Sequence, residues 1–200
     1  MLASLYLELR RISSIRRCLS VDATKTLVCS LVLSKLDHWN SILSGSSQYL
    51  LQKLQKVQNT ATRIIHRVPR SEHASPLLCA LCWLSVRSGV GHGICSLCCI
   101  SLAGSGPACL SGLALVCTPS GCLRSSSGIR GLIVPTVGVG AYGRRSFACR
   151  GPAAWGGLPA ALGRGDAVVS FGSALGAHLF QLQERTWGPG NVSLPGIFAA

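Results

Sequence analysis

Apolar residues recur every three or four positions through most of the first 70 residues, a pattern typical of amphipathic helices. The first stretch, residues 2–18, predicts a helix with this inward face: Leu2, Leu5, Tyr6, Leu9, Ile12 and Ile15. A second helix should begin after Ser20, whose hydroxyl is well placed as an N-cap, with Asp22 favourable in the first turn of the helix dipole. Gly45 is a good stop for this second helix.

A third helix is expected to open at Ser46 or Ser47 and to be ended by Pro69. Its apolar face consists of Leu50, Leu51, Leu54, Val57, Ala61, Ile64 and Ile65. Because only a short Gly-Ser link separates the second and third helices, they should pack as an antiparallel pair. Ser75-Pro76 suits the start of a short fourth helix. The residues expected to pack it onto the pair are Leu77, Leu78, Leu81 and Trp83.

The pattern weakens in the remaining chain. Residues 86–169 are rich in Gly, Cys and Pro and predict an irregular, poorly ordered segment. Ser170 should cap a last helix over residues 170–183, and residues 184–200 are expected to be a disordered tail. The inward residues of that helix are Phe171, Ala174, Leu175, Leu179 and Leu182. The expected fold class is mostly α: a basic bundle of about four helices in residues 2–85, the irregular segment and one C-terminal helix.

Positive charge is the main compositional feature of the chain. It contains 19 Lys and Arg against 6 Asp and Glu, which gives a net charge of +13. Such an excess favours polyanions, and basic side chains off the apolar stripes are expected to contact the phosphate backbone of RNA or DNA weakly and with strong salt dependence. They are Arg10, Arg11, Arg16, Arg17, Lys25, Lys53, Lys56, Arg63, Arg67 and Arg70. The alternative is that these are merely solvated helix faces. Tyr6 and Trp39 could stack on bases, but their apolar-face positions favour core packing.

Residues 94–117 are apolar over a length that suggests a membrane span, but their glycines, proline and serines and the lack of a flanking basic cluster argue against membrane insertion. Eleven cysteines with no secretory leader predict reduced thiols and a cytoplasmic or nuclear location. Gly138, Gly140 and Gly143 mimic a dinucleotide fingerprint, but no helical pattern follows them, so no cofactor is expected.

Four cysteines give an alternative function. Cys79-x2-Cys82 and Cys95-x2-Cys98 are separated by twelve residues, close to the spacing of zinc ribbons, in which four thiolates hold a tetrahedral ion. A small zinc-binding interaction module is therefore a second hypothesis. Against it, Cys79 and Cys82 lie on a predicted helix between leucines, and this region of the chain is generally rich in cysteine.

A series of short segments runs along the chain: LRRI at 9–12, LS at 19–20, DATKTLVCSLVLSKLDHWNSILSG at 22–45, LQKLQKVQNTATRII at 51–65, HASPLLCALCWLSV at 73–86, LRSS at 123–126, VP at 134–135, YGRRSFA at 142–148, PAAWGGLPAAL at 152–162 and SFGSALGAHLF at 170–180. In this order they resemble the region after the polymerase palm in LINE-type (non-LTR), jockey-like retrotransposon reverse transcriptases. The resemblance covers roughly residues 5–183. It implies that residues 2–85 are a thumb-like region, which in the intact enzyme helps to hold the template–primer duplex.

The chain departs from that family at several positions. RSGVGHGICSLCCISLAGSG stands at 87–106, where a basic and aromatic helix is usual. Gly-Arg-Arg at 143–145 replaces Gly-Asp-Arg, Trp155-Gly156 replaces Trp-Asn, and Gly176 stands where a lysine is expected. Such replacements are typical of a degenerate fragment, and a decayed open reading frame without biochemical function is a third hypothesis.

Polymerase chemistry requires carboxylates clustered around two divalent ions, which the family places in the palm. The only aspartates of this chain are Asp22, Asp37 and Asp166, none of them adjacent. No catalytic residue, enzymatic activity or small-molecule substrate is therefore expected. The first hypothesis is a non-catalytic remnant of an RNA-directed DNA polymerase that at most binds an RNA or DNA backbone.

Overall fold

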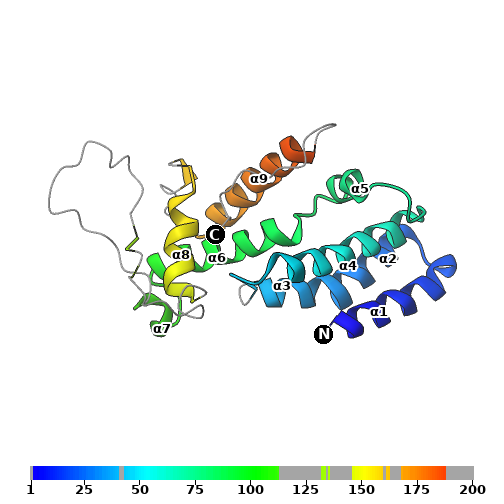
Figure 1. Ribbon diagram of the computed structural model, residues 1–200, viewed down its shortest axis with the longest axis horizontal. Helices are drawn as coiled ribbons and strands as arrows, with labels where there is room; N and C mark the ends of the chain where they lie inside the picture. Colours follow the sequence, from blue (N-terminus) through cyan, green and yellow to red (C-terminus); the bar gives the residue numbers. More distant parts are fainter. Residues whose placement is uncertain are drawn as a thin grey trace.

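The computed structural model describes residues 2–40, 43–112, 132–133, 135, 146–159, 161–162 and 168–187. These residues are mostly helical and contain no strand, which confirms the mostly α fold class. One group of helices, α1 to α5, lies at one end of an elongated molecule (Figure 1). α6 runs from this group toward α8, and α9 lies alongside α6 in the middle of the molecule. The dinucleotide-like glycines 138–143 lie outside the described residues.

The first group of helices is formed by residues 2–80. It consists of α1 (Leu2–Ile15), the 3-10 turn η1 (Arg16–Cys18), α2 (Val21–Val28), the π-helical turn η2 (Cys29–Leu33), α3 (Ser34–Asn40), α4 (Gln48–His66) and α5 (Ala74–Ala80). The π turn joins α2 to α3 without a break in the helical path. Ser30 and Ser34 donate their hydroxyls to the carbonyls of Leu27 and Ser30, and such side-chain bonds compete with the helical ladder at this point.

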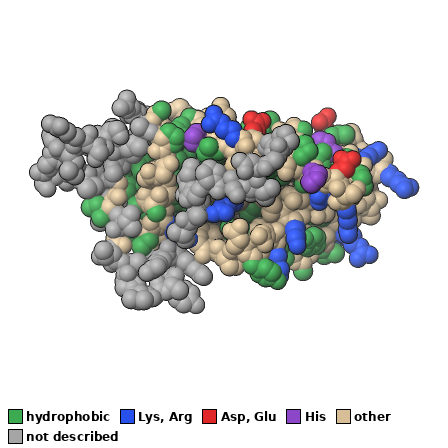
Figure 2. Space-filling view, turned by 45° about the horizontal axis from the view of Figure 1, so that its top comes forward, with side chains coloured by type: hydrophobic (Ala, Val, Ile, Leu, Met, Phe, Trp, Pro, Cys, Tyr) green, Lys and Arg blue, Asp and Glu red, His purple; other side chains and the backbone are tan. Residues whose placement is uncertain are grey.

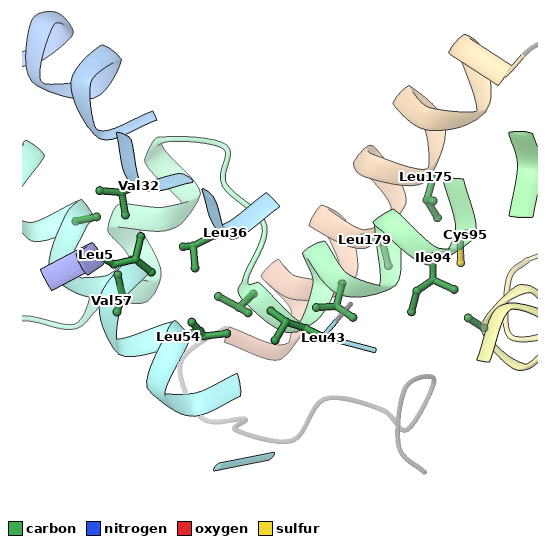
Figure 3. Close-up of a cluster of buried hydrophobic side chains, with 14 of the residues drawn as sticks. Leu5, Val32, Leu36, Leu43, Leu54, Val57, Ile94, Cys95, Leu175 and Leu179 are labelled. Atoms are coloured by element: carbon green, nitrogen blue, oxygen red, sulfur yellow. The ribbon is translucent and has the colours of Figure 1, made fainter. Parts of the chain in front are cut away.

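The core of this bundle confirms most of the predicted helical faces. Its fully buried side chains come from α1, α2, η2 and α4 and include Leu5, Leu9, Val28, Val32, Leu54, Val57, Ala61 and Ile65 (Figure 3). The predicted inward face of the first helix is wrong at Tyr6 and Ile15, which are 43% and 49% exposed. Leu5, Leu9 and Ile12 form a narrow stripe at i, i+4 and i+7 that already faces the core, so residues beside this stripe remain at the surface.

The helix boundaries follow local chemistry. The Ser20 hydroxyl accepts a hydrogen bond from the Ala23 amide at 3.1 Å, as predicted for an N-cap. Gly45 has φ 74°, a left-handed conformation that favours glycine. α5 begins at Ala74, earlier than predicted, which leaves Pro76 in the first turn, where amides have no helical partner.

The prediction of an irregular segment from residue 86 is wrong for α6 (Val86–Leu102) and α8 (Phe147–Gly156), which flank the short helix α7 (Ala108–Ser111). α6 begins with a cap: the Ser85 hydroxyl accepts from the Ser88 amide at 3.2 Å. Its glycines disfavour a helix locally, but α6 is in contact with α3, α4, α8 and α9. Burial of its apolar face outweighs the low propensity; the buried apolar residues are Val86, Val90, Ile94, Cys95, Cys98 and Cys99.

The last helix, α9 (Val168–Trp187), extends beyond the predicted 170–183 at both ends, so a disordered tail from residue 184 is wrong for 184–187. Phe171, Leu175 and Leu179 are buried as predicted, whereas Ala174 is exposed. Gln183 is fully buried: its side-chain oxygen accepts from the Ser85 amide at 2.6 Å, and its nitrogen donates to the Trp83 carbonyl at 3.0 Å. These bonds fix α9 to the turn that precedes α6.

No helix within the described ranges is long and apolar enough to cross a membrane. The apolar stretch 94–117 is divided at Ala103, where α6 has ended.

Candidate nucleic-acid interface

A groove of about 1320 Å³ lies between α1 and the C-terminal half of α4. The residues that line it come from α1, η1, α4 and the turn after α4; they are Tyr6, Leu9, Arg10, Ser13, Ser14, Arg16, Arg17, Lys56, Asn59, Thr60, Arg63, Ile64, Arg67, Val68 and Arg70. None of these lining residues is acidic. The groove therefore concentrates positive charge between two helices that are far apart in the sequence.

Seven of the ten predicted phosphate-binding residues line this groove. Figure 2 shows Lys and Arg side chains gathered toward the end of the molecule where α1 and α4 end in Figure 1. Arg10, Arg17, Lys56 and Arg70 are exposed, so their charged groups are open to a ligand. Guanidinium groups suit this task because their planar array of donors matches phosphate oxygens.

Arg16 is different from the other groove arginines because it is buried, with 6% of its surface exposed. Its Nε donates to the Ile64 carbonyl at 2.9 Å, its Nη2 to the Ile65 carbonyl at 2.7 Å and its Nη1 to the Leu19 carbonyl at 2.8 Å. Two of these carbonyls belong to the last turn of α4, where they lack helical partners. Burial, and then the nearby charge of Arg67, lower the pKa of Arg16 from its usual value. These hydrogen bonds of Arg16, the first residue of η1, thus hold the chain that follows α1 against the end of α4.

Two more groove arginines are partly engaged with the backbone. Arg63 donates through Nε and Nη2 to the Glu72 carbonyl at 3.1 and 2.8 Å. Arg67 donates through Nη2 to the Arg16 carbonyl at 3.0 Å, and it has φ 56° at the C-cap of α4. These bonds hold their guanidinium groups at the groove and leave other N–H groups on each arginine for a ligand.

The remaining three predicted residues lie outside the groove lining. Arg11 forms an ion pair with Glu8 at 3.7 Å. The Lys53 ammonium lies 4.2 Å from the centroid of the Tyr49 ring. Lys25 is exposed on α2. The structure therefore does not place these three charges with the other seven.

Sequence analysis did not identify the uncharged polar residues of the groove, which are Ser13, Ser14, Asn59 and Thr60. The feature of the sequence that could have identified them is their spacing along the two helices. Tyr6, Arg10 and Ser13 lie four and three positions apart on α1, which places them on one helix face beside the buried stripe. Lys56, Asn59 and Arg63 lie three and four positions apart on α4, which also places them on one helix face. The Ser14 and Thr60 hydroxyls donate to the carbonyls of Arg11 and Lys56. The Ser13 hydroxyl and the Asn59 amide are therefore the groups of this set suited to donate to phosphate oxygens.

The two cysteine pairs do not come together as the alternative hypothesis of a zinc site requires. Cys95 and Cys98 are buried in α6, whereas Cys79 is half-buried and Cys82 is exposed. Among the described residues, no group of three or more His, Cys, Asp or Glu side chains is arranged to hold a metal ion. Burial, and to a smaller extent a neighbouring cysteine, raise the pKa of Cys95 and of Cys98 to about 12. Such thiols are poor metal ligands because a ligand must be the thiolate.

The chain matches no protein family model, and it shows no significant similarity to a curated protein or to a solved structure.

Proposed function

We propose that this protein is a non-catalytic nucleic-acid-binding chain that holds the phosphate backbone of RNA or DNA in the groove between α1 and α4. The observation that carries the proposal is the groove lining, with seven basic side chains and no acidic one. Converging cations without a counter-charge repel one another, and a polyanion relieves that repulsion while releasing its own counterions.

The resemblance to the region after the palm of non-LTR retrotransposon reverse transcriptases supports this proposal from the sequence. That region is expected to hold the template–primer duplex, and residues 9–12 and 51–65, which carry part of the resemblance, contribute Arg10, Lys56 and Arg63 to the groove. α6 also forms a helix where the family usually has one. By this proposal the protein is a polymerase remnant without polymerase chemistry.

The test is binding of fluorescently labelled RNA and DNA oligonucleotides, measured by anisotropy at several salt concentrations. We expect micromolar affinity at low salt. With about five phosphate contacts, the affinity should fall roughly 100-fold between about 50 and 200 mM salt. A variant with Arg10→Ala, Arg17→Ala and Lys56→Ala should bind weakly and should reduce the slope of log affinity against log salt by about 2 to 3.

The matched control carries Arg11→Ala, Lys25→Ala and Lys53→Ala, which remove the same charge outside the groove lining. It should keep nearly the affinity and salt slope of the unchanged protein. Equal losses in the two variants would show that net charge, and not the groove, causes binding. Polyglutamate should compete weakly with the oligonucleotides; competition as strong as that of RNA would point to acidic proteins as the ligand instead.

A further inference from the structure

Tyr6 lines the groove, but phosphate binding does not explain why an aromatic ring is exposed there. Its ring belongs to a helix whose core-facing stripe is already filled by Leu5, Leu9 and Ile12, each at most 3% exposed. Tyr6 itself is 43% exposed and lines the same groove as Arg10. An aromatic ring left at the surface beside a cluster of cations offers a stacking partner to a flat ligand group.

The positions on α1 set the order of these groups along the groove. Tyr6, Arg10 and Ser14 are four residues apart, so they follow one another along one helix face. At 1.5 Å per residue they cover about 12 Å of the groove. The Tyr6 ring is thus at one end of this row of side chains, and Lys56 and Arg63 of α4 line the opposite wall of the groove.

We infer that the groove takes single-stranded RNA or DNA, with one unpaired base stacked on the Tyr6 ring and the adjoining phosphates held by Arg10, Arg17 and Lys56. This inference rests on the proposed function and specifies its substrate. The resemblance implies a template–primer duplex, but a single strand fits this groove better. Base pairing and stacking cover the base faces of a duplex, which leaves a groove tyrosine with nothing flat to contact. An unpaired base presents a π-face whatever its identity, so the site accepts many sequences.

A second exposed tyrosine provides a matched control. Tyr49 is 66% exposed on α4 and lies outside the groove lining, with its ring against the Lys53 ammonium. Tyr49→Leu therefore removes the same atoms as Tyr6→Leu without touching the proposed stacking site. Since both tyrosines are well exposed, neither change should disturb the fold, which circular dichroism and thermal unfolding can verify.

The experiment compares an oligothymidine of about twelve nucleotides with an abasic strand of the same length and charge, using the full chain at low salt. Tyr6→Leu should weaken binding of oligothymidine by about 5- to 100-fold, the usual range for one stacked base. The same variant should change binding of the abasic strand less than twofold. Tyr6→Phe should bind both strands like the unchanged protein, because the ring is retained, and so should Tyr49→Leu.

The remaining outcomes distinguish a failure of the Tyr6 stacking site from a failure of phosphate binding in the groove. Unchanged oligothymidine binding by Tyr6→Leu, equal losses on both strands, or tighter binding of a duplex than of the single strand would overturn the stacking site. In each of these cases Arg10→Ala still weakens binding of every strand if the proposed function is right. If the unchanged protein binds neither strand, the proposed function fails together with this inference.

Discussion

Arg16 and Arg17 are adjacent arginines in very different surroundings. The Arg16 guanidinium is buried and donates to three backbone carbonyls, two of them at the end of α4. Arg17 is exposed and lines the groove. One position in sequence therefore separates a residue that holds the bundle together from a residue that is open to a ligand.

This difference gives a prediction for the two arginines. Arg16→Met should lower the free energy of unfolding by roughly 2–4 kcal/mol, because it leaves buried carbonyls of Ile64 and Ile65 without donors. Arg17→Met, the matched control, should change that free energy by less than about 0.5 kcal/mol, since it alters only an exposed side chain. Urea unfolding followed by circular dichroism measures both. Similar stabilities for the two variants would contradict the structural role of Arg16.

At the scale of elements, α6 and α8 approach each other closely through small residues. A Cβ built on Gly151 of α8 would lie 2.9 Å from the Cys98 sulfur of α6 and 3.3 Å from the Phe147 ring. Atoms are not found so close, so a larger residue at position 151 requires the Cys98 side chain or one of the two helices to move. The glycine costs α8 some helix propensity, and the close packing against α6 offsets that cost.

Gly151→Ala should therefore destabilise the protein by about 1–3 kcal/mol, the usual cost of overpacking. Cys98→Ala on its own should also destabilise, because it leaves a small cavity, but the double variant should be more stable than the sum of the two changes predicts. A double-mutant cycle from chemical denaturation measures this coupling. Gly172→Ala is the control: nothing lies within 4 Å of its added methyl group, so it should stabilise α9 by up to about 1 kcal/mol. Strict additivity of the Gly151 and Cys98 changes would disprove their contact.

Across the whole molecule, the buried thiols of α6 make stability depend on pH. Burial raises the pKa of Cys95 and Cys98 to about 12 from the usual thiol value of 9.0. Because a raised pKa means that the folded chain keeps its protons longer than the unfolded chain, their stabilisation is complete below pH 9 and is lost as the pH rises toward 12. The free energy of unfolding should fall by up to about 1.4 kcal/mol per pH unit for each thiol in this window.

Denaturant unfolding between pH 8 and pH 11 measures this slope. Lysine and tyrosine side chains titrate in the same range, so the decisive comparison is with a variant that carries Cys95→Ala and Cys98→Ala. That variant should show a shallower decline, even though it is less stable at pH 8. Parallel declines would mean that these thiols do not titrate with unfolding.

The sequence predicted the parts of this molecule whose cause is local. Periodic leucines and a capping serine are enough to place α2 and α4. Of the ten basic residues that the sequence proposed for phosphate binding, seven line one groove. α6 was missed because its glycines weaken the local signal, and its helix depends on burial against α3, α4, α8 and α9. Arg16 was predicted to bind phosphate, and its structural role, like that of Gln183, was missed for the same reason: their partners lie about 48 and 98 residues away.

α6 also connects the groove to the far end of the molecule, because it packs against α3 and α4 on one side and α8 and α9 on the other (Figure 1). If this shared core makes the chain unfold as one unit, a ligand in the groove should protect buried thiols of α6 that it never touches. Cys95 and Cys98 are 0% exposed, so alkylation at pH 8 requires unfolding. An oligonucleotide at about 100 times its dissociation constant should slow their alkylation roughly 100-fold, since it binds only the folded chain.

Mass spectrometry after timed alkylation reads each cysteine separately, and Cys109, which is exposed, serves as the internal control whose rate should not change. The variant with Arg10→Ala, Arg17→Ala and Lys56→Ala should lose the protection, because its groove no longer holds the strand. Unchanged alkylation of Cys95 and Cys98 at a concentration that saturates the groove would mean that α6 opens independently of the bundle. In that case the two ends of the molecule would be energetically separate, and the effect of a ligand would be confined to α1 through α4.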